Sequence, residues 1–131
     1  MANDIPFLTD LQLAVMRVLW GRGAATVAEI TDELRPSRGL AQTTIATVLS
    51  RLEKRGIVGH DAQTRQFVYR ALISEPDARG SMVAELTDRL FAGDSAALVS
   101  HLLTARQFSK SDLARVKAIL AEHERSKGAR R

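Results

Sequence analysis

Apolar residues recur every three to four positions in several stretches of this chain, a period typical of amphipathic helices. In residues 43–56 one predicted helix face is apolar, while the opposite face carries small or cationic side chains. The apolar set is Ile45, Val48, Leu49 and Leu52. Arg55 and Gly56 are expected to end this helix, because a cation suits the last turn and glycine readily adopts the left-handed conformation.

Two helices are predicted before this one, and each opens with a threonine followed three residues later by a glutamine or glutamate. Thr9 with Gln12, and Thr26 with Glu29, form the capping-box pattern, in which side chains and backbone N–H groups pair reciprocally. The residues expected to face the core are Leu8, Leu11, Val15, Val18, Leu19 and Trp20 in the first helix, and Val27, Ile30 and Leu34 in the second.

Glycine and proline mark the ends of these two helices. The first is predicted to end at Gly21 and Gly23. Pro36 is predicted to close the second, because proline disfavours helical geometry in the residue before it. After a short polar connection, the third helix is expected to begin near Ala41 or Gln42. A short helix, a turn and a helix with a small, polar outer face form a helix-turn-helix pattern.

After the third helix the sequence takes on the composition of β-strands. Residues 57–60 and 66–70 are rich in β-branched and aromatic side chains, and the segment between them suits a four- or five-residue hairpin loop. Three helices followed by a hairpin define a winged helix-turn-helix. Arg65 at the tip and Arg70 beside it are placed to reach a DNA backbone. Two aromatic residues of the hairpin are expected to cover the core, Phe67 and Tyr69.

Residues 74–124 are predicted to form three further helices. Ser74 is placed to cap the first, residues 93–95 break it, and Ser109 or Ser111 caps the last. Their apolar positions are Met82, Val83, Leu86, Leu90, Phe91, Leu98, Val99, Leu102, Leu103, Leu113, Val116, Ile119 and Leu120. Three short helices cannot bury this surface by themselves, so we expect pairing with a second copy, the alternative being folding back on the winged helix.

Positive charge is concentrated in two places. Residues 35–70 carry seven Lys or Arg against two acids, and residues 125–131 add four more cations, whereas residues 1–34 carry two against five. Because the basic region coincides with the helix-turn-helix and the hairpin, a polyanionic partner is favoured. The terminal run is expected to be a basic, disordered tail.

Several other functions have little support in the sequence. The chain has no cysteine and three scattered histidines, so no metal site is indicated, and we expect no cofactor. No phosphate-binding glycine loop or nucleophile motif is present, and an enzyme is not expected. The acidic N-terminus and the lack of a long apolar run give no sign of a secretion signal or membrane span, so a cytoplasmic location is expected.

One block of this sequence resembles a known family. Thr44-Ile45-x-Thr47-x-Leu49-x-Arg51-Leu52, followed by Lys54 and Gly56, is similar to the BlaI/MecI/CopY family of penicillinase-type repressors, and the similarity extends from about Leu8 to Leu120. The resemblance implies a homodimeric transcriptional repressor that binds dyad DNA operators of the TACA/TGTA kind. The copper-sensing branch of that family binds metal through cysteines, which this chain lacks.

The resemblance also implies a mode of release from DNA, in which a membrane sensor metalloprotease pathway leads to a cut in the second C-terminal helix. The matching bond here joins His101 to Leu102. Control of genes of the beta-lactam response is implied in the same way. Release by a small ligand remains an alternative, as does a winged-helix module that binds another protein.

The predicted fold is therefore mostly α (α+β). A winged helix-turn-helix occupies residues 1–73, a helical dimerisation domain residues 74–124, and the tail residues 125–131. The residues predicted to bind DNA are Gln42, Thr43, Thr44, Ala46, Thr47, Ser50, Arg51, Lys54 and Arg65. The residues predicted to form the dimer are Val83, Leu86, Leu90, Leu98, Leu102, Val116 and Leu120.

Overall fold

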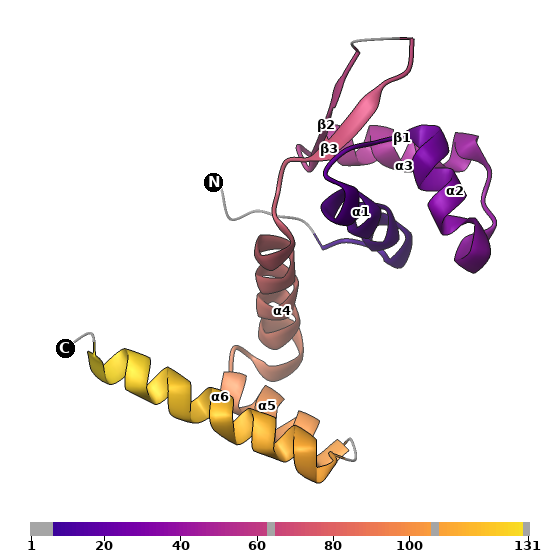
Figure 1. The fold of residues 1–131 in the computed structure, drawn as a ribbon. Helices are drawn as coiled ribbons and strands as arrows, with labels where there is room; N and C mark the ends of the chain where they lie inside the picture. The colour runs from indigo at the N-terminus through magenta and orange to yellow at the C-terminus, as the bar shows by residue number, and fades with distance from the viewer. Residues whose placement is uncertain (1–6, 63–64, 106–107, 130–131) are drawn as a thin grey trace. The chain divides into compact units, whose positions relative to one another are not determined.

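The computed structural model describes residues 7–62, 65–105 and 108–129. The chain divides into two compact units, Met1–Leu86 and Thr87–Arg131, which we describe separately. In chain order the elements are α1 (Asp10–Arg22), β1 (Ala25–Thr26), α2 (Val27–Arg38), α3 (Gln42–Lys54), β2 (Val58–Asp61), β3 (Val68–Ala71), α4 (Glu75–Phe91), α5 (Ser95–Ala105) and α6 (Lys110–Ala129) (Figure 1). This is an α+β winged-helix fold followed by helices, as the sequence predicted.

Helix α1 begins with the predicted capping box. The backbone N–H of Gln12 donates to Thr9 Oγ1 at 3.2 Å, and Thr9 N–H donates to Gln12 Oε1 at 3.1 Å. The helix ends at Gly23, whose φ is 86° and whose N–H donates to the carbonyl of Leu19. The prediction that Gly21 also ends the helix was wrong, because Gly21 lies in the last turn with ordinary negative φ.

Helix α2 also has its predicted capping box, between Thr26 and Glu29. The prediction that Pro36 closes this helix was wrong, since the helix continues to Arg38 with Pro36 inside it. A proline in the last turn removes a single helical N–H donor, so its cost is limited there. The helix ends instead at Gly39, which has a left-handed φ of 60° and donates to the carbonyl of Arg35.

Helix α3 begins at Gln42, as predicted, and ends in a Schellman motif. Gly56 has a φ of 77°, and its N–H donates to the carbonyl of Glu53. The N–H of Ile57 donates to the carbonyl of Leu52 at 3.0 Å. This pair of bonds satisfies carbonyls that the helix end leaves open and turns the chain directly into β2. The predicted left-handed glycine is thus confirmed.

The sheet has three antiparallel strands in the order β1-β3-β2. Strand β1 was not predicted, because two residues give no periodic signal; it forms only because Ala25 and Thr26 lie opposite Tyr69 and Val68. The hairpin strands are shifted from the predicted bounds, β2 by one residue and the start of β3 by two. Phe67 therefore lies in the loop between β2 and β3.

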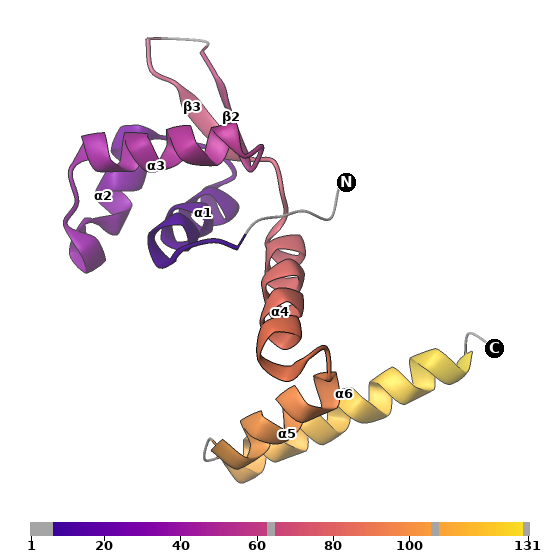
Figure 2. The ribbon, with the colours of Figure 1, turned by 180° about the vertical axis from the view of Figure 1, so that it is seen from behind.

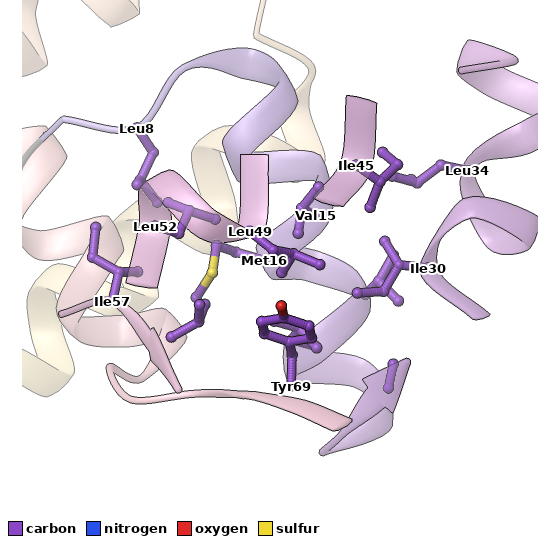
Figure 3. Packing of buried hydrophobic residues seen from close by; sticks show 14 of the residues in the cluster. Leu8, Val15, Met16, Ile30, Leu34, Ile45, Leu49, Leu52, Ile57 and Tyr69 are labelled. Atoms are coloured by element: carbon purple, nitrogen blue, oxygen red, sulfur yellow. The ribbon is translucent and has the colours of Figure 1, made fainter. Parts of the chain in front are cut away.

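The core of the first unit lies between α1, α2, α3 and the sheet, and it contains the predicted apolar faces (Figure 3). Its fully buried members include Leu8, Val15, Met16, Leu19, Ile30, Ile45, Leu49, Leu52, Ile57 and Val58. Tyr69 is buried, as predicted, whereas Phe67 is 46% exposed, so its predicted role in covering the core was wrong. A loop position does not alternate with its neighbours as a strand position does.

Trp20 lies beside this core and fastens α4 to it. The indole Nε1 donates to the carbonyl of Ile73 at 2.9 Å, just before α4 begins. Within α4, Ala78 is 1% exposed and belongs to the core cluster, and Met82 packs against it. Ser74 caps the helix, since its Oγ accepts from the N–H of Asp77 at 3.1 Å. The first turns of α4 are therefore part of the winged-helix unit.

In the second unit, the described residues include no buried apolar side chain, and only Thr87 is buried. Its helices are well capped all the same. Ser109 and Asp112 exchange side chain–backbone hydrogen bonds at 3.0 and 3.2 Å, which makes Ser109 the cap of α6. Helix α6 extends to Ala129, into the predicted disordered tail, with Arg125 paired to Glu122. None of the described helices is long and apolar enough to cross a membrane.

Two glycines offer a matched test of the helix ends. Gly56→Ala should destabilise the first unit by about 1–2 kcal/mol, because its positive φ disfavours any Cβ although the space around it is open. Gly21→Ala, also in open space but inside α1, should stabilise by about 0.5–1 kcal/mol. Urea unfolding followed by Trp20 emission measures both; equal effects of the same sign would contradict the assigned conformations.

Candidate nucleic-acid interface

The outer face of α3 is the largest group of predicted site residues that the structure brings together. Burial of Ile45, Leu49 and Leu52 turns the opposite face to solvent. Of the predicted residues, Ala46 is half-buried and the others are exposed, namely Gln42, Thr43, Thr44, Thr47, Ser50, Arg51, Lys54 and Arg65. The N-terminal half of this face is small and polar, and its C-terminal half is cationic.

Thr47 shows how this face is arranged locally. Its hydroxyl donates to the carbonyl of Thr43 at 3.0 Å, one turn earlier in the helix. The hydroxyl proton is therefore already used, and the oxygen can still accept a hydrogen bond while the methyl group remains available for apolar contact. Such a surface suits base edges, where a donor or a thymine methyl group must be matched at short range.

Three of the predicted cations are available to an external anion. In the described part of the chain, Arg51, Lys54 and Arg65 have no ion-pair partner, and all are exposed. Arg55 differs, because its guanidinium donates to Gln12 Oε1 at 3.1 Å and to the carbonyl of Phe7, which ties the end of α3 to the start of α1.

Arg70, which the sequence placed near a DNA backbone, forms an ion pair with Asp61. Residues 61 and 70 lie on adjacent strands of the hairpin, so this pair joins β2 to β3. Its charge is largely neutralised within the hairpin, and we do not count Arg70 in the interface.

A groove connects the hairpin to the start of α3. It has a volume of about 400 Å³ and is lined by α2, α3 and the hairpin. Its lining residues are Thr26, Val27, Ala28, Gln42, Ala46, Arg65, Gln66, Phe67 and Tyr69. Arg65 thus lies along the same groove as Gln42, although 23 positions separate them in the sequence. Both ribbon views show the hairpin extending beyond the three helices (Figures 1 and 2).

The loop end of the hairpin is held by His60, to which the sequence assigned no role. Its Nδ1 lies 2.7 Å from Glu53 Oε2, and its ring stacks on Phe67 with centroids 4.2 Å apart. His60 pairs in register with Tyr69, whose pKa is raised by burial and by the negative charge of Glu53. These contacts join α3, β2 and the loop next to Arg65.

A three-membered ion cluster on the surface links the end of α1 to α2. Arg22 lies 3.0 Å from Glu29 and 3.3 Å from Glu33, which accounts for the two carboxylates that the sequence places one turn apart. The hydrogen bond from Thr26 N–H lowers the pKa of Glu29, and the charge of Arg22 adds to this. The described residues contain no group of three potential metal ligands.

These features define a winged helix-turn-helix protein with an exposed, partly cationic third helix. A family model described as penicillinase repressor matches residues 8–122. The penicillinase repressor of Bacillus licheniformis is 31% identical over 125 residues, which cover 95% of this chain and 98% of that protein. The chain therefore belongs to the penicillinase repressor family, as the resemblance indicated.

Other known proteins are similar to this chain in sequence or in fold. The methicillin resistance regulatory protein MecI of Mammaliicoccus sciuri is 22% identical over 120 residues, covering 92% of this chain and 98% of MecI. The solution structure of the DNA-binding domain of the repressor BlaI is 36% identical, covers 56% of this chain and 90% of that domain, and superposes with a TM-score of 0.51. YusO of Bacillus subtilis, at 16% identity and a TM-score of 0.51, shares the fold.

The contacts of His60 lead to a prediction about the hairpin. His60→Ala should loosen residues 65–67, because Phe67 loses its stacking partner and Glu53 its hydrogen bond to the hairpin. Backbone order parameters of these amides, measured by NMR relaxation, should fall from about 0.85 toward 0.6. His123→Ala, on exposed α6, is the control and should leave them unchanged. Equal order in the two variants would show that the stack does not hold the hairpin.

Proposed function

We propose that this protein is a DNA-binding transcriptional repressor that places α3 in the major groove of its operator and its hairpin on the phosphate backbone. This proposal rests on the exposed face of α3, where small polar residues are followed by cations that have no ion-pair partner among the described residues. Arg65 lies along the groove next to this face. The relatives named as penicillinase repressor and methicillin resistance regulatory protein support control of beta-lactam response genes.

The residues of this interface divide into three roles. Gln42 can form a bidentate pair with adenine, and the threonine methyl groups of Thr43 and Thr47 can contact thymine. The small side chains of Thr44, Ala46 and Ser50 allow the helix backbone to approach the bases. The cations Arg51, Lys54 and Arg65 neutralise phosphates. Such contacts position the protein on DNA without reading its base sequence.

The role of Arg65 can be tested by the salt dependence of operator binding. Arg65→Ala should weaken binding to all sequences and reduce the slope of log K against log salt by about one unit, since one phosphate contact is lost. Arg115→Ala, an exposed arginine of α6, is the control and should keep the parent slope. An unchanged slope in the Arg65 variant would remove the hairpin from the interface.

Base reading by α3 has a different signature. Gln42→Ala and Thr43→Ala should change which operators are preferred, because a bidentate base contact discriminates by about 1–3 kcal/mol. Competition binding against operators of the TACA/TGTA kind with single base changes measures this. A uniform loss across all operators would show that these side chains do not read bases.

We further propose that the second unit forms a homodimer. Its described residues bury no apolar side chain, and a 45-residue unit without a core cannot be stable alone. Its large exposed apolar residues are Leu90, Val99, Leu102, Leu103, Leu113, Ile119 and Leu120. Val83 and Leu86, at the end of the first unit, are exposed as well. A second copy offers the same apolar surface in return, as a two-fold interface requires. The two winged-helix units of such a dimer could then bind the two halves of a dyad operator.

Truncation tests the dimer. Because Ala78 and Met82 pack against the core of the first unit, the chain is cut after Leu86 and not before α4. The shortened protein should keep its Trp20 emission, be monomeric in light scattering, and bind a dyad operator about 10²- to 10⁴-fold more weakly, since the second contact is no longer intramolecular. A folded dimer of residues 1–86 would show that the interface lies in the first unit.

For release from DNA we propose a cut in α5 between His101 and Leu102. Both residues are exposed, and the cut detaches Leu102, Leu103, Leu113, Ile119 and Leu120 from the rest of the chain. At about 1.5–3 kcal/mol for each side chain buried in a dimer, their loss removes roughly 8–15 kcal/mol as an upper bound. Dimers of micromolar to nanomolar affinity are held by about 8–12 kcal/mol, so dimerisation should fail.

Mass spectrometry of the protein from cells exposed to a beta-lactam tests this mechanism. We expect a fragment ending at His101 in induced cells and intact chains in untreated cells. Because a helical bond must open locally before a protease can cut it, Leu113→Ala, which removes an apolar contact of the proposed dimer and leaves the scissile bond unchanged, should speed cleavage. Intact chains in induced cells whose operator is vacant would rule out the cut and favour release by a ligand.

A further inference from the structure

A second hollow in the first unit lies away from the proposed DNA interface, between α1 and the start of α4. Its volume is about 250 Å³. Its walls are Leu13, Arg17 and Trp20 from α1, and Glu75, Ala78, Arg79, Met82 and Val83 from α4. The spacing in each helix is three to four residues, so each wall is one continuous helix face. No residue of the proposed DNA interface contributes to this hollow.

Most of the lining is apolar, and the only hydrogen-bond donor of its aromatic residue, Trp20, is already used. The indole N–H of Trp20 already donates to the carbonyl of Ile73 at 2.9 Å, so the ring acts as an apolar surface. Ala78 is 1% exposed, and its small side chain leaves room between the larger residues. A cavity of about 150 Å³ in another protein binds benzene, so this hollow can hold one aromatic ring with a short chain.

The charged residues of the hollow favour an anion. Arg79 lies 3.3 Å from Glu75, which neutralises both within α4. Arg17 has no ion-pair partner in the described part of the chain, and it is exposed. The net charge of the lining is therefore +1, carried by Arg17. Guanidinium groups bind carboxylates through two parallel hydrogen bonds.

From these features we propose that the hollow between α1 and α4 is a binding site for a small amphipathic carboxylate. The apolar part of the ligand lies against Trp20, Ala78 and Met82, and its carboxylate pairs with Arg17. This inference does not depend on DNA binding, because the two sites share no residue and binding can be measured without DNA.

The single tryptophan of the chain lies in the wall of this site and reports its occupation. Titration of the full-length protein with 4-phenylbutyrate should change Trp20 emission saturably, with half-saturation near 1 mM or below, the range expected of a ligand of this size. The uncharged 4-phenylbutyramide should bind about tenfold more weakly, since it cannot pair with a guanidinium.

Two variants separate the charge of Arg17 from general effects. Arg17→Gln should weaken the acid about tenfold while leaving the amide unchanged, whereas Arg17→Lys should restore part of the preference for the acid. Arg38→Gln is the matched control, since Arg38 is an exposed α2 arginine that does not line this hollow. Methyl chemical shifts of Ala78 and Val83, followed in the same titration, should move with the same midpoint.

Three outcomes would overturn the proposal. The first is no saturable change in emission up to 10-fold above the expected midpoint, and the second is equal affinity for acid and amide in the parent protein. The third is a Trp20 emission that shifts on dilution of the ligand-free protein and does not respond to the acid, which would assign the hollow to a second copy of the chain.

Discussion

The burial of one face of α3 is the constraint on which the rest of the first unit depends. Ile45, Leu49 and Leu52 are completely buried, so the helix cannot rotate without exposing three large apolar side chains. The small polar residues and the cations on the opposite face are therefore oriented by the packing of the buried face, and not by contacts that they make themselves. Arg55 also restricts rotation of α3, because its hydrogen bond to Gln12 ties the end of α3 to α1.

A second constraint concerns how the hairpin is held. Glu53, His60 and Phe67 come from a helix, a strand and a loop, and together they fix the base of the loop that carries Arg65. The groove that Arg65 and Gln42 both line is therefore supported by residues that need not contact a ligand themselves. Such residues position a site and would be missed by any search restricted to charged, exposed side chains.

The two units differ in how their apolar residues are used. The first buries a core large enough to hold three helices and a sheet, whereas the described part of the second has well-capped helices with no buried apolar side chain. Capping and helix propensity define helices locally, but they do not supply a core. The incomplete burial, and not any single residue, is the reason for assigning this surface to a second copy.

Features that depend on neighbours along the chain could be predicted from the sequence: the starts of α1, α2, α3, α4 and α6, the left-handed Gly56, the apolar face of α3 and the family. These follow from capping patterns and periodicity, which act over a few residues. Two predictions from the sequence were wrong. The end of α2 was placed at Pro36, although the left-handed Gly39 ends the helix, and Phe67 was placed in the core. Strand β1, the pairing of Arg70 with Asp61, the role of His60 and the hollow beside Trp20 were decided by tertiary structure. Each depends on how separate elements of the chain pack against one another, and such packing leaves no local pattern in the sequence.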